Sequence, residues 1–263
     1  METLEQLRER RAYECRLTPD RALASLDEAE AFLRDRGLLT RTADSALPSL
    51  YEACHEEAYR PGGRGFAEWP RTKWPWFGQL AERGFLVVGV HRGRNVVVTQ
   101  EVAALLDPIC RAELERLIAV DPEAARLLEH LAAAGPSNIE DLRVELALTT
   151  KQLKAVRSRL ERCGALVSRS LQVTAGAGHA HSSELARWNQ IRSTPREGAV
   201  QLHQAFEALL VAGVRAAVVA PERELRRWFS WHWYWQDTFV EKLVRDGLIR
   251  RVDGHVTAAE TAS

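Results

Sequence analysis

The side chains best suited to bind a polyanion are concentrated between Thr149 and Ser170. This segment holds six basic residues and one acidic residue, Glu161, so it has a local net charge of +5 in a chain whose formal net charge is +0. Lysine and arginine bind phosphates, and a helix in the major groove of DNA also needs polar side chains for base edges. We therefore expect nucleic-acid contacts from Thr149, Thr150, Lys151, Gln152, Lys154, Arg157, Ser158, Arg159 and Arg169. The alternative is a solvated helix face in a module that contacts another protein.

A pair of histidines follows in a glycine-rich stretch. His179 and His181 flank Ala180, and Gly176 and Gly178 would let the backbone approach a minor groove or phosphates. We expect both histidines to belong to the nucleic-acid site. A His-x-His pair can also bind metal, but no third ligand is visible nearby, so we predict no metal site and no cofactor.

Two carboxylates are candidates for catalysis. Asp27 lies in a predicted helix, and Glu57 belongs to an acidic cluster around His55. A carboxylate beside a nucleic-acid cleft could activate water for the excision of a base. Nothing in the spacing distinguishes these carboxylates from surface charge, and the chain has no glycine-rich phosphate loop, no serine-histidine-aspartate motif and no paired metal-ligand spacing. The motifs therefore provide no positive argument for catalysis.

Tryptophan is concentrated in two short segments, 69–76 and 228–235. Beside basic residues such as Arg71 and Arg226, these rings could stack on unpaired bases or wedge a base step. Indole rings also fill cores between domains, and we favour that interpretation for most of them.

The elements that would position the basic segment form a winged helix-turn-helix pattern over 121–188. One helix is predicted from Asp121–Pro122 to Gly135, a second begins with a capping box of Ser137 and Glu140, and a third begins with a capping box of Thr149 and Gln152 and stops at Gly164. Two capped helices joined by such a short link favour a steep crossing angle. Strand patterns at 166–173 and 181–188, joined by a turn at 175–178, supply the wing.

The flanking regions show the same order of helix and hairpin. Before the central module we predict helices at 19–36, with Thr18 as N-cap, at 50–55, at 74–83 and at 100–119 with a break at Asp107–Pro108, and a hairpin of 85–90 with 96–99. After a linker at 192–200 we predict a helix at 237–246 and a hairpin of 248–252 with 255–257. The expected fold class is mainly α with small β-hairpins (α+β), arranged as tandem winged helix-turn-helix domains at 1–120, 121–190 and 191–263.

The composition sets broader limits. With 263 residues and 46% hydrophobic content, the chain can build two or three packed domains. The four cysteines are widely spaced and are expected to be buried, reduced thiols. The N-terminal residues do not resemble a signal peptide, and the longest apolar stretch is interrupted by Arg215, so we expect a cytoplasmic protein with no membrane contact.

Three stretches resemble a known family. They are Leu47-Pro-Ser-Leu-Tyr-Glu-Ala, Trp69-Pro-Arg-Thr-Lys-Trp-Pro-Trp and the helix-turn-helix from Leu127 to Arg169. These stretches are similar to those of the AlkZ-related winged-helix proteins of bacteria, over most of the chain. The resemblance implies tandem winged helices. It also implies a relation to enzymes that excise alkylated or crosslinked bases with a Gln-x-Gln or Gln-x-Asp motif in their N-terminal part.

That catalytic motif is missing here. Residues 1–120 contain no such triplet, and the nearest stretch in a comparable helix, Ser25-Leu26-Asp27, keeps only an acid. The leading hypothesis is therefore a double-stranded DNA-binding winged-helix protein with a role in DNA repair, which docks the 149–164 helix in the major groove. The alternatives are a monofunctional DNA glycosylase and a protein-interaction module with an unknown protein partner.

Overall fold

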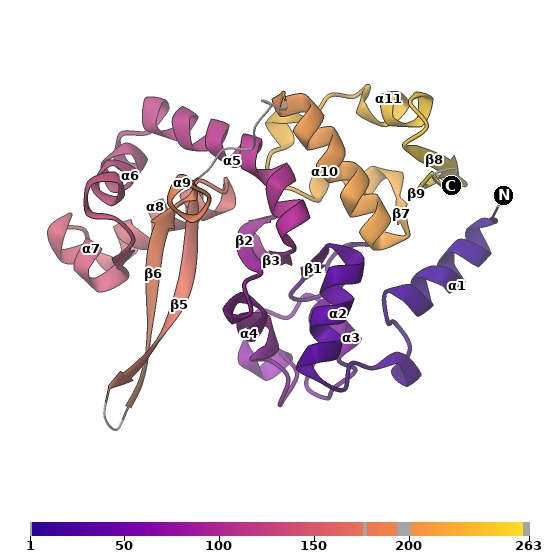
Figure 1. Cartoon of the computed structure of the whole chain (residues 1–263), viewed down its shortest axis with the longest axis horizontal. Coiled ribbons are helices and arrows are strands. Elements are labelled where there is room, and N and C mark those ends of the chain that lie inside the picture. Colours follow the sequence, from indigo (N-terminus) through magenta and orange to yellow (C-terminus); the bar gives the residue numbers. More distant parts are fainter. Residues whose placement is uncertain (1, 176–177, 194–200, 260–263) are drawn as a thin grey trace.

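The computed structural model describes residues 2–175, 178–193 and 201–259, and it describes side chains outside 170–182 (Figure 1). The chain begins with α1 (Leu4–Glu14), which a capping box of Thr3 and Gln6 starts. The helix predicted at 19–36 is shorter than expected. Pro19–Arg21 forms a separate 3-10 turn, and α2 (Leu26–Arg36) begins at Ser25, whose hydroxyl accepts from the Glu28 amide. Thr18 makes no side-chain cap bond, so the helix starts at the residue that does.

The N-terminal module, which we define as α2 to β3, surrounds a small antiparallel sheet. Its strands are arranged in the order β1-β3-β2. The helices and strands after α2 are β1 (Leu38–Thr40), α3 (Leu50–Ala53), the 3-10 turn η2 (Phe66–Glu68), α4 (Trp76–Glu82), β2 (Leu86–His91) and β3 (Arg94–Val98).

The long helix α5 (Gln100–Val120) continues through Pro108. The predicted break at Asp107–Pro108 is therefore wrong. Proline removes one backbone hydrogen bond from a helix. The helix persists because its neighbours are held on both sides of the proline. Ile109 and Cys110 are fully buried, and the carboxylate of Asp107 accepts hydrogen bonds from the Trp188 indole and from Arg111.

The central module, α6 to β6, contains the best-predicted elements. The capping box of Thr149 and Gln152 is confirmed, whereas the one predicted for Ser137 is wrong. Asn138 caps the second helix instead, because Ser137 and Asn138 form a short strand on β6. The elements are α6 (Pro122–Ala134), β4 (Ser137–Asn138), α7 (Ile139–Glu145), α8 (Thr150–Arg162), β5 (Leu166–Ala175), β6 (Gly178–Arg187) and the following α9 (Trp188–Ile191).

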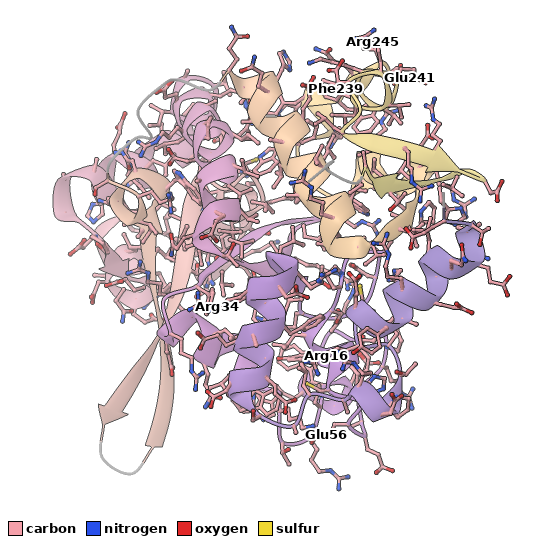
Figure 2. The ribbon with its side chains drawn as sticks, turned by 45° about the vertical axis from the view of Figure 1, so that its right-hand side comes forward. Arg16, Arg34, Glu56, Phe239, Glu241 and Arg245 are labelled. Atoms are coloured by element: carbon pink, nitrogen blue, oxygen red, sulfur yellow. The ribbon has the colours of Figure 1, made fainter. Side chains whose placement is uncertain are left out.

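The C-terminal module, α10 to β9, has a sheet with the order β7-β9-β8. Its elements are α10 (Leu202–Ala217), β7 (Val219–Pro221), η3 (Glu222–Arg227), η4 (His232–Tyr234), α11 (Phe239–Arg245), β8 (Ile249–Val252) and β9 (His255–Ala258). Most of the predicted linker, 194–200, lies outside the described residues. Figure 2 shows Phe239, Glu241 and Arg245 of α11 at the opposite end of the view from Glu56 of the N-terminal module.

The three sheets that the described residues form share one topology. In each, the first strand in the sequence pairs with the third, and the third pairs with the second. A helix and a hairpin end each module, as predicted, and the α+β fold class is confirmed. The sequence patterns missed the first strand of each sheet, because β1, β4 and β7 have only two or three residues. Such short strands carry no measurable alternation of polar and apolar side chains.

The modules pack against one another through buried side chains. One apolar cluster joins β2 and β3 to α5, α10 and the C-terminal sheet. Trp228 and Trp231 are fully buried in this cluster, as favoured for most of the tryptophans. The Trp231 indole donates to the carbonyl oxygen of Cys163 in the central module. Gly164, the next residue, lies in the same contact between modules, and a Cβ on it would overlap the Sγ of Cys110.

Candidate nucleic-acid interface

A cavity of about 430 Å³ opens on the N-terminal module. The end of β1, the glycine-rich loop before η2 and the turn between β2 and β3 form its walls. The positive φ of Gly93 (+74°) lets that turn reverse within two residues. None of the described residues that line this cavity is acidic, and four are arginines. The lining residues are Thr40, Arg41, Thr42, Gly63, Arg64, Trp69, His91, Arg92, Gly93, Arg94 and Asn95.

Arg41 is a half-buried cation of this cavity whose neighbours are aromatic rings. Its guanidinium carbon lies 5.0 Å from the ring centroid of Trp69 and 4.6 Å from that of Phe77. Within the described parts of the chain, its buried Nε has no hydrogen-bond partner and no carboxylate pairs with it. Burial lowers the pKa of this guanidinium below its ordinary value, because removing a charge from water costs free energy. An anion bound in the cavity would offset that cost.

A buried network holds the part of the cavity wall that His91 and Arg94 form. The Nδ1 of His91 lies 2.6 Å from the Trp228 carbonyl oxygen, and its Nε2 lies 2.7 Å from Oδ1 of Asp44. The other carboxylate oxygen of Asp44 lies 3.2 Å from Arg94. A carbonyl oxygen can only accept, so Nδ1 carries a hydrogen. Burial raises the pKa of Asp44, but the hydrogen bond from His91 and the charges of His91, Arg94 and Arg92 outweigh burial and lower this pKa below its ordinary value.

A second cavity, of about 560 Å³, lies between the N-terminal and central modules. Arg41 and Asn95 line both cavities, so the two are adjacent. The central module contributes Arg157 of α8 and Arg169 of β5 to the lining of the second cavity, and Arg192 also lines it. We call the two cavities together the arginine groove. The arginines that line it are Arg41, Arg64, Arg92, Arg94, Arg157, Arg169 and Arg192, and Glu82 is its described acidic lining residue.

This fold resembles that of a DNA glycosylase. The solved structure of Streptomyces sahachiroi DNA glycosylase AlkZ overlays with a TM-score of 0.59 at 14% sequence identity. The match covers 99% of this chain and 70% of that of AlkZ. No protein-family model matches the sequence, and no curated protein matches it either. The comparison shows a shared fold across all three modules.

The predicted residues of α8 divide into an exposed and a paired set. Lys151, Lys154 and Ser158 are exposed, as is Thr150 at the first helical position. The Oε1 of Gln152 accepts from the Thr149 amide and hydroxyl, so both of these residues serve the cap. A cap satisfies amides that would otherwise lack partners, and it defines where the exposed face begins.

Three arginines of the predicted site have different surroundings. Arg157 is half-buried and lies 2.8 Å from Glu161, which also accepts from the Ser168 hydroxyl. The exposed Arg159 contacts Asp121, the N-cap of α6, at 3.1 Å and Glu123 in the first turn of α6 at 3.0 Å. The exposed Arg169 faces the groove. The local charge of +5 is thus reduced by acidic residues that the segment itself does not contain.

The remaining candidate residues lie away from the arginine groove or outside the described side chains. Asp27 is exposed at the start of α2 and forms an ion pair with Arg83 at 2.6 Å. Glu57 is exposed in a turn after α3. Neither lines either cavity of the groove. The side chains of His179 and His181, on β6, are outside the described ones, and the described residues contain no group of three metal-ligating side chains.

Sequence reasoning missed most of the groove. The segment Arg92-Gly-Arg-Asn falls between the two predicted strands 85–90 and 96–99, and Arg41 falls between the predicted helices 19–36 and 50–55, so neither is a predicted site residue. A usable signal was the pair of arginines, Arg92 and Arg94, in the turn of the hairpin, whereas Arg41 has no other basic residue between 37 and 47. What the sequence could not indicate is that residues 41, 95 and 169 lie on one surface, because that depends on how the modules pack.

Proposed function

We propose that this protein binds double-stranded DNA as three tandem winged helices, at 1–120, 121–190 and 191–263. The arginine groove carries the proposal. Seven arginines line it, and Arg41 is held between two rings with no acidic partner among the described residues. DNA presents a regular row of phosphates, and basic side chains at several positions bind such a row with little dependence on sequence. The fold shared with the AlkZ glycosylase supports a role in DNA repair.

The groove and α8 have separate tasks in this proposal. The arginines contact phosphates and fix the position of the duplex, whereas Lys151, Lys154 and Ser158 on α8 enter the major groove. Lys154 precedes Arg157 by three residues, so the two side chains are neighbours on the helix surface. The exposed face of α8 and the groove are therefore contiguous.

The first test measures the binding of a fluorescent duplex by anisotropy between about 50 and 200 mM salt, where several phosphate contacts change affinity by orders of magnitude. Arg41→Gln and Arg169→Gln remove one groove cation each from different modules. We expect each to lower the salt slope by about one unit and the double variant by about two. The matched control is Arg8→Gln, on the exposed surface of α1, which should leave the slope unchanged.

Two results would contradict the proposal. Equal slopes for the groove variants and the control would remove the groove from the DNA contact. No binding by the wild-type protein at low salt would favour a module that contacts another protein.

A second candidate function is base excision, which the fold shared with AlkZ favours. The candidate acids from the sequence are Asp27 and Glu57, but Asp44 lies closer to the groove, behind His91 and Arg94. Incubation with duplexes that carry alkylpurines or crosslinks, followed by heat or alkali, would convert excised positions into strand breaks. Loss of breaks in Asp44→Asn but not in Asp27→Asn would assign the acid. Intact strands across the panel with the wild-type protein would leave binding as the function.

A further inference from the structure

The loop that borders the first cavity carries an exposed aromatic side chain. Phe66 is 67% exposed. Together with that of Val144, this is the largest exposed fraction among the large apolar side chains of the described residues. The Phe66 ring contacts two tryptophans edge to face, with centroid distances of 4.7 Å to Trp69 and 5.0 Å to Trp74. An exposed phenyl ring costs free energy in water, and these contacts hold it in place on the surface.

The loop itself is tightly braced. The Arg60 amide donates to the Glu68 carbonyl oxygen, and the Arg64 amide donates to the Glu68 carboxylate. The Gly63 amide donates to the Arg60 carbonyl oxygen, and a Cβ at Gly63 would lie 2.8 Å from Cβ of Glu68. A braced loop loses little conformational entropy when it binds a ligand. Phe66 is therefore presented in advance of binding.

A short chain of contacts connects Phe66 to the arginine groove. Phe66 packs on Trp69, and the guanidinium of Arg41 lies over the ring of the same tryptophan. Arg64, two residues before Phe66, lines the same cavity. The exposed ring is thus at the edge of a surface that suits phosphates. A partner that places an aromatic face next to phosphates fits this edge, and a nucleotide does so.

We propose that Phe66 is a stacking residue for an unpaired nucleobase, so that the protein prefers DNA with a locally unpaired base over a fully paired duplex. In a paired duplex each base face is covered by its neighbours, and a side chain reaches one only after unstacking it. A bulged base exposes its face at little cost. Base stacking on an aromatic side chain tolerates any base, because every base has a π face. This inference rests on the proposed DNA binding.

The test compares two duplexes of equal length and labelling, one fully paired and one with a single-nucleotide bulge, by anisotropy at fixed salt. The wild-type protein should bind the bulged duplex about ten-fold more tightly, within the range measured for one stacked base. Phe66→Ala should lose that preference and leave the paired duplex within about two-fold. Phe66→Trp should retain it, because the indole also offers a flat face. Tyr13→Ala, which removes an exposed aromatic ring from α1, is the matched control.

The outcomes separate the two proposals. If the wild-type protein binds neither duplex, DNA binding fails and this inference fails with it. If it binds both equally, or if Phe66→Ala keeps the preference for the bulge, only the stacking role is overturned. Equal losses in Phe66→Ala and Tyr13→Ala would also overturn it, because they would show a general effect of removing surface rings.

Discussion

At the scale of single residues, the arginines of the groove differ in what surrounds them. Within the groove, Arg94 contacts the carboxylate of Asp44, whereas Arg41 has aromatic rings as its neighbours. Outside the groove, Arg159 contacts two carboxylates. A guanidinium that already pairs with a carboxylate has less to gain from a phosphate. Counting basic residues in the sequence therefore overstates some contributions to binding and understates that of Arg41.

The ionised carboxylate of Asp44, which contacts His91, contributes to the stability of the fold, and acid removes that contribution. The pKa of Asp44 is lowered below its ordinary value in the folded protein, so its contribution is fully present above the unfolded pKa of about 3.9 and is lost as the pH falls through the folded pKa. We expect Asp44→Asn to lower the free energy of unfolding in urea at pH 7. The difference from the wild type should stay constant down to about pH 4 and shrink at lower pH. A difference that grows as the pH falls would show that the ionised carboxylate does not stabilise the fold.

At the scale of secondary-structure elements, α8 has one side against the rest of the protein and one side in solvent. Leu153, Val156 and Leu160 are buried at helical spacing, and the backbone of Glu161 approaches Gly89 on β2. A side chain at Gly89 would begin 3.1 Å from the Glu161 carbonyl oxygen. The last turn of α8 is thus held against the N-terminal module, which leaves its first two turns to contact a ligand.

This placement leads to a prediction for the exposed lysines. Lys151→Ala with Lys154→Ala should lower the salt slope of duplex binding by about two units, since each lysine releases about one counterion. Anisotropy across the same salt range measures it. Arg159→Ala on the same helix serves for comparison and should change the slope by less than one unit, because Asp121 and Glu123 already neutralise that side chain. An effect confined to Arg159 would reverse the orientation of α8 on the duplex.

At the scale of the whole molecule, a neutral chain places seven of its arginines along one groove. The formal net charge is +0, so no overall field attracts DNA, and the groove must act at short range.

The described helices include none with the length and apolar character that a membrane crossing requires. Figure 1 shows β5 and β6 as a long hairpin that extends beyond the helices of the central module.

The junction of the modules depends on Gly164. Its φ of +76° disfavours any side chain, and an added Cβ would also overlap Cys110 and lie within 3.4 Å of Val90 and Trp231. Gly164→Ala should therefore destabilise the protein in urea by more than the about 1–2 kcal/mol that left-handed backbone costs alone. Gly247→Ala is the control, because that glycine has φ +67° but open space around it.

Thiol labelling checks the same substitution independently. Burial raises the pKa of Cys163 to about 11 and that of Cys110 well above its ordinary value, so neither should react in the native wild-type protein at pH 8. We expect Gly164→Ala to speed the labelling of both thiols, and Gly247→Ala to leave it unchanged. Equal labelling rates in the two variants would show that the modules do not depend on contact at Gly164.

Local patterns in the sequence by themselves determined the central helices, the hairpins and the basic face of α8. The capping box of Thr149 and Gln152 and the stop at Gly164 act within a few residues, so the sequence contains everything needed to place them. The same locality explains the errors. The capping box at Ser137 and the break at Pro108 satisfy local rules that strand pairing and burial override.

Only the tertiary structure decided which residues form the candidate site. Arg41, Asn95 and Arg169 line one cavity although they are far apart in the chain, and Arg159 meets Asp121 across a helix pair. These relations depend on the packing of buried apolar side chains between modules, which fixes distances that no sequence spacing encodes. Whether an arginine is neutralised or left to bind a phosphate is decided by that packing.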